Sequence, residues 1–280
     1  MTALAALAVT GSTGALGGAV AGALAERGVP QRLLVRSPDR APRLPGASVH
    51  RAAFGDRDDC LAALEGVETL FMVSASESAD RLAQHLALVD AAADAGVRHV
   101  VYTSFVGAGP DAVFTLARDH GATEERIRSS GMAWTFLRDS FYLDVLELFA
   151  GEDDALRGPA GQGRCAFVAR SDVAAAATAV LLEPAAHAGA TYELTGPEAL
   201  NLADAAATLS AVRARPFRFV DETLAEAYAS RAGYGAPDWQ VDAWVSTYTA
   251  IAAGGMAAVS GDVERLTGRA PRSFEQLLRS

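Results

Sequence analysis

Short apolar runs alternate with longer helical stretches over the first half of the chain. The runs have the length and the flanking turn residues of buried strands, and they predict strands at residues 4–9, 31–35, 48–52, 69–73, 99–103 and 134–137. Between the fourth and fifth runs, leucines and alanines at helical spacing predict a helix over 78–95, and a shorter helix covers 124–130. This alternation is typical of an α/β protein with a doubly wound parallel sheet.

A glycine motif follows the first predicted strand. Gly11, Gly14 and Gly17 stand between that strand and an alanine-rich helical stretch that ends at Arg27. Glycine has no Cβ, so the backbone can turn sharply there and approach a pyrophosphate, whose charge the N–H groups and dipole of the helix stabilise. Strand, glycine turn, helix and second strand in this order indicate a Rossmann-type dinucleotide-binding fold, and we favour this over an ordinary tight turn.

Arg36 indicates which dinucleotide the chain binds. It comes directly after the second predicted strand, where NAD-binding proteins usually carry an acid for the ribose 2′-hydroxyl. A guanidinium at this place favours the 2′-phosphate of NADP instead, and Ser37 and Arg40 could add a hydroxyl and a second charge. The alternative is that Arg36 is a solvated strand end. We expect NADP(H) as the cofactor.

The pattern becomes less regular after residue 137. A polar, glycine-rich stretch at 151–163 predicts a surface loop, followed by a helix over 171–182, a strand over 191–194, a helix over 202–212 and an apolar run at 216–220. The remaining segment carries Trp239, Trp244 and Tyr248 among helical patterns and predicts a small α-rich domain with both tryptophans in its core.

These elements predict two domains. The NADP-binding Rossmann domain covers residues 1–150 and is completed by strand and helix segments from 166–198. A smaller, α-rich C-terminal domain that covers the substrate takes up most of 151–280.

Composition limits the partners and the compartment. The 280 residues are 50% hydrophobic, enough for a substantial core, and the net charge of −10 disfavours nucleic acid and anionic membrane surfaces. No apolar run is long enough to span a membrane, and the N-terminus lacks the basic start of a signal peptide. We therefore expect a cytoplasmic protein with a small-molecule partner and no nucleic acid or membrane partner, and a homodimer stays an open possibility.

The cysteines and histidines show no metal-site spacing. Cys60 and Cys165 stand far apart and are expected to be small buried hydrophobic residues, and the five histidines form no HExxH-type cluster. We predict that the protein holds no metal.

All 24 basic residues are arginine, so the chain contains no lysine. Short-chain dehydrogenases usually pair a catalytic tyrosine with a lysine in a YxxxK motif, in which the lysine lowers the tyrosine pKa and holds the nicotinamide ribose. This chain cannot form that pair. His120 and Glu124 occupy the expected spacing after the fifth strand instead.

The chain resembles the NmrA-like atypical short-chain dehydrogenase/reductases, and within them the branch of NADPH-dependent quinone oxidoreductases and triphenylmethane reductase. The motifs that carry the resemblance span nearly the whole chain. They are T-G-S-T-G-A-L-G at Thr10, V-R-S-P at Val35, G-D at Gly55, Y-T-S at Tyr102, L-A-R-D-H-G-A-T-E at Leu116, L-R-D-S-F-Y at Leu137, A-R-S-D-V-A at Ala169, Y-E-L-T-G at Tyr192 and G-D-V-E-R-L-T-G-R at Gly261. The resemblance implies a Rossmann domain, a small C-terminal domain and a cleft between them for NADPH.

The resemblance also implies which residues bind the cofactor. The pyrophosphate loop would comprise Gly11, Ser12, Thr13, Gly14, Ala15 and Leu16. Arg36 would bind the 2′-phosphate and Asp56 the adenine. The nicotinamide side would comprise Ser74, Ala75, Ser76, Thr103, Ser104 and Phe105, with Arg138 in the same cofactor site. Asp139 and Phe141 stand where the family has asparagine and tryptophan.

Tyr142 and His120 are the candidate catalytic residues. Tyr142 either donates a hydrogen bond to a substrate carbonyl or packs its ring with the hydroxyl at the surface. His120 is either a proton donor or a solvated residue beside Gly121 at a helix start, and we favour the solvated residue slightly. Phe105 and Phe141 either wall an apolar substrate pocket or belong to the core, and we expect Phe105 in the core.

The missing lysine favours an acceptor that needs little acid catalysis. A quinone accepts hydride and leaves a stabilised phenolate, whereas a simple ketone leaves a strongly basic alkoxide. We therefore expect an NADPH-dependent reductase of quinone-like or other conjugated electrophilic small molecules. The alternative is a non-catalytic NADP(H)-binding redox sensor, for which cofactor binding without turnover would be the distinguishing sign.

Overall fold

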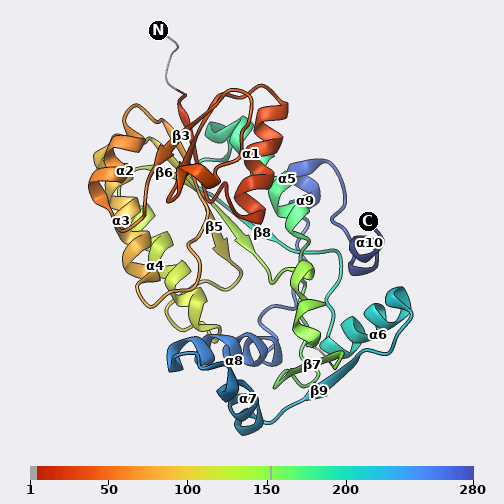
Figure 1. Ribbon diagram of the computed structural model, residues 1–280. Helices are drawn as coiled ribbons and strands as arrows, with labels where there is room; N and C mark the ends of the chain where they lie inside the picture. The colour runs from red at the N-terminus through yellow and green to blue at the C-terminus, as the bar shows by residue number, and fades with distance from the viewer. Residues whose placement is uncertain (1–4, 152) are drawn as a thin grey trace. The chain divides into compact units, whose positions relative to one another are not determined.

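Seven strands form one sheet in the computed structural model, which describes residues 5–151 and 153–280 (Figure 1). The order is β3-β2-β1-β4-β5-β6-β8, and the pairs β1–β2, β1–β4, β2–β3 and β4–β5 are parallel. The strands are β1 (Leu7–Thr10), β2 (Gln31–Val35), β3 (Ala47–Arg51), β4 (Thr69–Met72), β5 (His99–Phe105), β6 (Ala133–Asp139) and β8 (Ala190–Leu194). The predicted doubly wound parallel sheet of Rossmann type is confirmed.

Two strands run further than the sequence pattern suggests. β5 ends at Phe105 and β6 at Asp139, two residues beyond the predicted ends. All seven residues of β5 are buried, so its polar end, Thr103 and Ser104, stays in the sheet. The predicted first strand begins at residue 4, which lies outside the described residues, and β1 is observed from Leu7.

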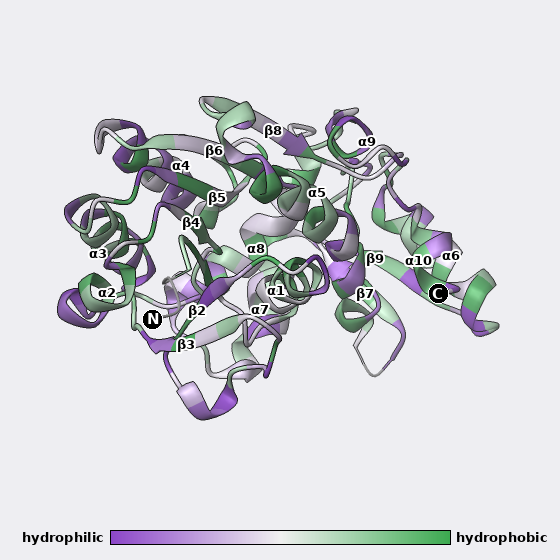
Figure 2. Ribbon diagram, turned by 90° about the horizontal axis from the view of Figure 1, so that it is seen from above, coloured by the Kyte–Doolittle hydropathy of each residue, from purple (hydrophilic) through white to green (hydrophobic). Residues whose placement is uncertain are grey.

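Helices cover both faces of the sheet. Figure 2 shows α2, α3 and α4 on one face and α1 and α5 on the other, with largely hydrophobic strands between them. The helices are α1 (Ala15–Glu26), α2 (Arg57–Leu64), α3 (Arg81–Asp94), α4 (Thr115–Ser129) and α5 (Arg170–Leu182). This layering is the one expected when each β-α-β crossover is right-handed.

Two helices correct the sequence prediction. The helix predicted over 124–130 begins at Thr115, because Gly121 is accommodated inside α4 and does not interrupt it. The helix α2 is absent from the prediction, since its first turn is polar and gives no apolar periodicity. The side chain of Asp56 caps it by accepting a hydrogen bond from the N–H of Asp59 at 3.1 Å.

The chain alternates between two compact units. The first comprises the residues up to Ser104, Asp119–Arg138 and Val173–Tyr192, and the second Phe105–Arg118, Asp139–Asp172 and Glu193–Ser280. The sequence suggested one main boundary at residue 150 with a return over 166–198. Most of α5 and β8 do belong to the first unit, but the chain enters the second unit already at Phe105 and again at Asp139.

The second unit combines helices with a small sheet. Strand β7 (Ala155–Gly158) pairs in parallel with β9 (Arg218–Asp221), so the predicted loop over 151–163 contains a strand. A Cβ at Gly158 would lie 2.3 Å from the ring of Tyr248, which explains why the loop-like composition coexists with tight packing. The other helices are α6 (Leu202–Arg213), α7 (Leu224–Arg231), α8 (Asp238–Ala252), α9 (Asp262–Thr267) and α10 (Phe274–Leu278).

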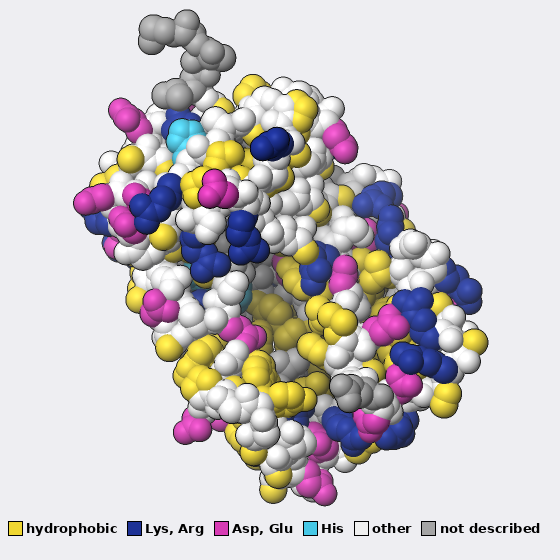
Figure 3. Space-filling view, viewed as in Figure 1, with side chains coloured by type: hydrophobic (Ala, Val, Ile, Leu, Met, Phe, Trp, Pro, Cys, Tyr) yellow, Lys and Arg dark blue, Asp and Glu magenta, His cyan; other side chains and the backbone are white. Residues whose placement is uncertain are grey.

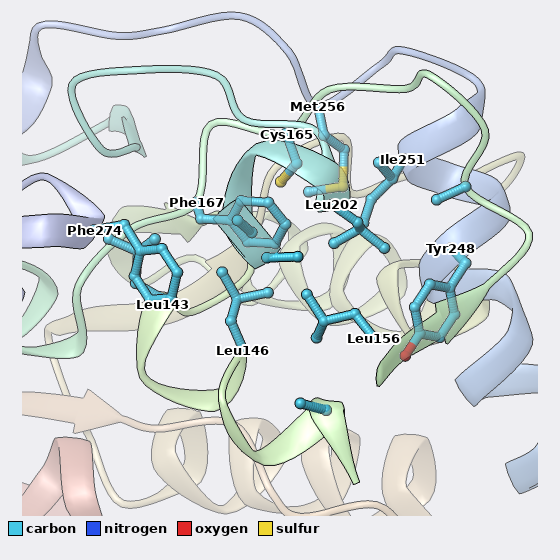
Figure 4. Close-up of a cluster of buried hydrophobic side chains, with 14 of the residues drawn as sticks. Leu143, Leu146, Leu156, Cys165, Phe167, Leu202, Tyr248, Ile251, Met256 and Phe274 are labelled. Carbon is cyan, nitrogen blue, oxygen red and sulfur yellow. The ribbon is translucent and has the colours of Figure 1, made fainter. Parts of the chain in front are cut away.

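The core of the second unit is built from scattered segments. Figure 4 shows Leu143, Leu146, Leu156, Cys165, Phe167, Leu202, Tyr248, Ile251, Met256 and Phe274 converging in one cluster. Trp239 and Trp244 are half-buried and do not belong to it, so their predicted place in the core is wrong. Tyr248, one helical turn after Trp244, takes that place.

The two cysteines are buried free thiols, as the sequence predicts. Burial raises the pKa of Cys60 to about 11 and that of Cys165 to about 12, so both thiols stay protonated and unreactive at neutral pH.

Charged side chains of both signs are interspersed on the face drawn in Figure 3. Arginines are commonly paired with acids, as in Arg57–Asp94 at 2.7 Å and Arg265–Asp262 at 2.6 Å. Within the described residues, no helix is both long and apolar enough to cross a bilayer.

Candidate functional site

The predicted cofactor residues of the first unit lie at one edge of the sheet. The register aligns Leu7 with Thr69 and Met72 with Tyr102, so the carboxyl ends of β1, β4 and β5 come together. The chain moves from β1 outward to β2 and β3 and then returns to β4 on the other side of β1. Ligands of open α/β sheets bind outside the carboxyl ends of the strands at such a reversal.

The glycine loop after β1 has a backbone that only glycine tolerates. Gly11 has a φ of +66°, in the left-handed region, and a Cβ on it would lie 3.1 Å from that of Val73. A Cβ on Gly17 would lie 2.4 Å from the carbonyl oxygen of Gly11, a forbidden approach. The N–H of Gly14 donates to the same oxygen at 2.9 Å and closes the turn.

The start of α1 has unused hydrogen-bonding capacity. Gly14 is its N-cap and gives no side-chain cap, and the first turn contains no acidic residue. Ser12 is 3% exposed, and among the described residues its hydroxyl has no hydrogen-bond partner. Free N–H groups, the positive end of the helix dipole and an unpartnered hydroxyl fit a pyrophosphate. The predicted residues Thr13, Ala15 and Leu16 belong to the same turn.

Arg36 is exposed directly after β2 and forms no ion pair with any residue that the structure describes. Ser37 and Arg40 are exposed beside it. A solvated, unpaired guanidinium at this edge fits a 2′-phosphate. Asp56 is half-buried and already engaged as the cap of α2, and its contact with adenine stays a prediction.

Two buried threonine hydroxyls tie the predicted cofactor segments together. Thr10 Oγ1 accepts from the N–H of Val73 at 2.8 Å and donates to the carbonyl oxygen of Phe71 at 3.2 Å, which joins the end of β1 to that of β4. Thr103 Oγ1 accepts from the N–H of Ser74 at 2.9 Å. The structure thus brings residues 74–76 beside the end of β5.

Ser104 and Arg138 meet at the buried carboxylate of Glu124. Glu124, 1% exposed, accepts from Ser104 Oγ at 2.6 Å and from Arg138 at 2.9 and 2.7 Å, while Arg128 donates at 2.9 Å. Such a bidentate, fully partnered carboxylate is tolerated in the interior. The guanidinium of Arg138 therefore has a partner inside the first unit, and its role toward the cofactor stays a prediction. Sequence reasoning missed this function of Glu124, although Arg128 four residues later was a signal.

His120 does not have the surroundings predicted for it. It lies inside α4, not at a helix start, and is 6% exposed. One ring nitrogen hydrogen-bonds to Tyr102 Oη at 2.8 Å and the other to Arg81 at 2.8 Å. Burial, followed by the positive charge of Arg81, holds its pKa well below the usual 6.5. The prediction that His120 is solvated is therefore wrong. A neutral imidazole whose two nitrogens are both hydrogen-bonded is also poorly placed to donate a proton to a substrate.

In the second unit, Tyr142 is paired with a buried acid. Its hydroxyl donates to Asp139 Oδ2 at 2.6 Å, and the guanidinium of Arg170 lies 5.0 Å from its ring centre. Asp139 is 3% exposed, and burial raises its pKa to about 8 against the opposing hydrogen bond from Tyr142. Burial and the neighbouring Asp139 raise the pKa of Tyr142 well above 10. The alternative from the sequence, in which the Tyr142 hydroxyl faces solvent, is therefore wrong, because this hydroxyl is hydrogen-bonded to the buried Asp139.

Three phenylalanines form an aromatic cluster in the second unit. The ring centres of Phe105 and Phe141, and those of Phe105 and Phe114, lie 4.9 Å apart, and those of Phe114 and Phe141 lie 5.0 Å apart. Phe105 belongs to the buried core cluster, as expected, whereas Phe114 and Phe141 are half-buried. The cofactor contact predicted for Phe105 stays a prediction.

The comparisons with known proteins agree with this geometry. A family model described as NAD(P)H-binding matches residues 11–184. The chain belongs to this family. It is 34% identical to the NAD(P)H azoreductase of Xenophilus azovorans, over 97% of this chain and 96% of that protein.

Two solved reductases share the whole fold of this family member. The NADPH-dependent quinone oxidoreductase of Escherichia coli, solved with NADPH, is 31% identical with a TM-score of 0.89 and 98% of each chain covered. The triphenylmethane reductase of Citrobacter sp., solved with NADP(H), is 30% identical with a TM-score of 0.87, covering 98% of this chain and 99% of that one. The predicted resemblance and the predicted cofactor NADP(H) are confirmed, and the protein is an NAD(P)H-dependent oxidoreductase.

Arg36→Asp tests the 2′-phosphate contact. Replacing the exposed guanidinium by a carboxylate removes charge-assisted hydrogen bonds and adds repulsion, so the Kd for NADPH is expected to rise at least about tenfold, or ~1.4 kcal/mol. The Kd for NADH, which lacks this phosphate, should not rise. Arg27→Asp, the same charge change at the other end of α1, is the control in fluorescence titrations. Undiminished NADPH affinity in Arg36→Asp would contradict the assignment.

Asp139→Asn tests the buried acid through stability. The carboxyl ionises near its ordinary value of 3.8 when unfolded and at about 8 when folded. Between these values the folded state keeps a proton that the unfolded state loses, so wild-type stability falls as pH rises, by ~1.4 kcal/mol per pH unit at most. Asparagine does not titrate. The unfolding free energy of Asp139→Asn in urea, relative to that of the wild type, should therefore increase from pH 4.5 to pH 8. An equal difference in unfolding free energy at both pH values would refute the prediction.

Proposed function

We propose that this oxidoreductase transfers hydride from NADPH to quinones, azo compounds or other conjugated electrophilic small molecules. The observation that carries the proposal is the lack of a strong general acid: the chain has no lysine, and His120 is buried and neutral. Acceptors that leave a delocalised anion after hydride addition need little proton donation, whereas simple ketones and aldehydes need much more. The names of the azoreductase, the quinone oxidoreductase and the triphenylmethane reductase support this class of acceptor.

Residues of the first unit would hold the cofactor, which supplies the hydride when bound. The glycine loop and the start of α1 would bind the pyrophosphate, and Arg36 the 2′-phosphate. Residues 74–76, tied to Thr103, would lie beside the nicotinamide half. These residues would fix the orientation of the cofactor. For acceptors of this class, orientation contributes more to the rate of hydride transfer than acid–base catalysis does.

Tyr142 is the proposed proton donor for acceptors that need one. With a pKa of about 8, Asp139 carries a proton at neutral pH for most of the time. A protonated Asp139 can donate to Tyr142 Oη across their 2.6 Å contact, which frees the tyrosine hydrogen for an acceptor atom. Solvent can serve instead where the reduced product is a weak base.

A non-catalytic NADP(H)-binding sensor would use the same cofactor site. It is less supported, because the relatives of 30% identity or more that match nearly the whole chain are named as reductases or oxidoreductases.

NADPH oxidation against a panel of acceptors tests the proposal. Quinones, azo dyes and triphenylmethane dyes are expected to be reduced, and simple aldehydes at least about a hundredfold more slowly, in line with the usual worth of a general acid. NADH is the cofactor control. Tight NADPH binding without reduction of any acceptor would favour the sensor and overturn the reductase.

Tyr142→Phe separates the two kinds of proton supply. The variant loses the hydroxyl to which Asp139 can donate a proton. Reduction of an enone, whose product is a stronger base, should therefore slow about tenfold or more. Reduction of a quinone should change less than about threefold, because solvent protonates its product. Steady-state rates at pH 7 give both numbers, and Tyr228→Phe, an exposed tyrosine hydroxyl, is the control. Equal losses with both acceptors would remove Tyr142 as the donor.

A further inference from the structure

A buried polar cluster lies between the sheet and the helices α3 and α4. It comprises Arg81, His85, Tyr102, His120 and Thr123, which we call the polar cluster. His85, Tyr102 and Thr123 are fully buried, and Arg81 is 4% exposed. Buried polar groups cost free energy unless they are partnered, so a cluster of this size in an apolar layer calls for a function.

The polar cluster reaches both backbone groups of one residue in the cofactor edge. The N–H of Ala75 donates to His85 Nε2 at 2.8 Å, and Arg81 Nε donates to the carbonyl oxygen of Ala75 at 3.0 Å. The preceding N–H, that of Ser74, donates to Thr103 at 2.9 Å. The loop after β4 is thus held by side chains from α3 and β5.

The hydrogen positions at His85 follow from these contacts. Because Nε2 accepts from Ala75, the ring proton lies on Nδ1, which donates to Thr123 Oγ1 at 3.0 Å. Thr123 in turn donates to the carbonyl oxygen of Asp119 at 2.7 Å. Burial, with the charge of Arg81 beside it, lowers the pKa of His85 to about 3, so this arrangement persists at neutral pH.

The second histidine of the polar cluster orients Arg81. His120 Nε2 accepts from Arg81 at 2.8 Å, so its Nδ1–H donates to Tyr102 Oη at 2.8 Å. Asp119 accepts from Arg81 at 2.9 Å and balances its charge. These contacts to His120 and Asp119 hold the guanidinium in place beside Ala75.

We propose that Arg81 and His85 are positioning residues for the nicotinamide half of NADPH, acting by holding the peptide groups of Ala75. The proposal rests on the proposed placement of residues 74–76 beside the nicotinamide. His120 and Tyr102 support the two positioning residues and do not touch cofactor or substrate themselves. The glycine loop would hold the phosphates of the cofactor, whereas the polar cluster would hold the opposite end of the same edge.

Comparing NADPH with adenosine 2′,5′-bisphosphate tests the proposal, because the bisphosphate keeps the adenosine end and lacks the nicotinamide. In His85→Leu, the Kd for NADPH is expected to rise about tenfold, while that for the bisphosphate changes less than about twofold. In His85→Gln, the side-chain oxygen can accept from Ala75 again, and NADPH affinity should return to within about threefold of wild type. Arg81→Met should behave as His85→Leu does.

Arg126→Met is the matched control. The ion pair of Arg126 with Asp90, at 2.6 Å, also joins α4 to α3 but is exposed and remote from Ala75 in the hydrogen-bond network. Both dissociation constants should stay at wild-type values in this variant. Equal losses of NADPH and bisphosphate affinity in His85→Leu, or no loss of either, would overturn the proposal, and so would failure of His85→Gln to restore NADPH binding.

The outcome separates this proposal from the proposed reductase function. Isothermal titration measures both dissociation constants without turnover. A selective loss of NADPH affinity in the variants upholds the positioning role even if the wild type reduces no acceptor. If the wild type reduces acceptors but the variants lose NADPH and bisphosphate affinity equally, only the positioning role is refuted.

Discussion

The parallel pairing of β1 with β2 on one side and β4 on the other is the constraint on which the cofactor edge depends. It sets the carboxyl ends of three strands side by side, so that the glycine loop, Arg36 and residues 74–76 share one edge although they are far apart in sequence. The hydroxyl of Thr10 then joins the first and third of these segments through the backbone of β4. Were this register shifted by one residue, the side chains that follow each strand would change faces.

Buried charge is the second organising element of the first unit. Glu124 and Arg81 both lie beneath the ends of strands, and each is surrounded by partners of opposite charge or by neutral donors and acceptors. Burying an ion costs several kcal/mol, and only full partnering offsets this cost. Both ions connect α3 or α4 to the strand edge, and they make its geometry specific.

The sequence was sufficient for the sheet because its strands are short, apolar and bounded by turn residues, and because Gly11 and Gly17 meet steric demands that any side chain would violate. It was insufficient where structure depends on contacts between distant segments. His120 looked solvated because Gly121 suggested a helix start, yet packing continues α4 through that position. The spacing of Arg81 and His85, one helical turn apart, carried a hint of a shared face, but nothing local shows that this face meets the peptide of Ala75. Trp239 and Trp244 show the reverse error, since large apolar residues do not have to be buried.

The aromatic cluster of Phe105, Phe114 and Phe141 belongs wholly to the second unit, and none of its rings takes part in the hydrogen bonds that hold the cofactor edge. Its apolar contacts have no directional requirement, unlike the hydrogen bonds around Ala75. Removing a ring from this cluster costs stability, about 3 to 5 kcal/mol for a phenylalanine inside a core, and Phe105 is the most buried of the three. A protein engineer can therefore vary the half-buried Phe114 and Phe141 at a lower cost in stability than the buried Phe105.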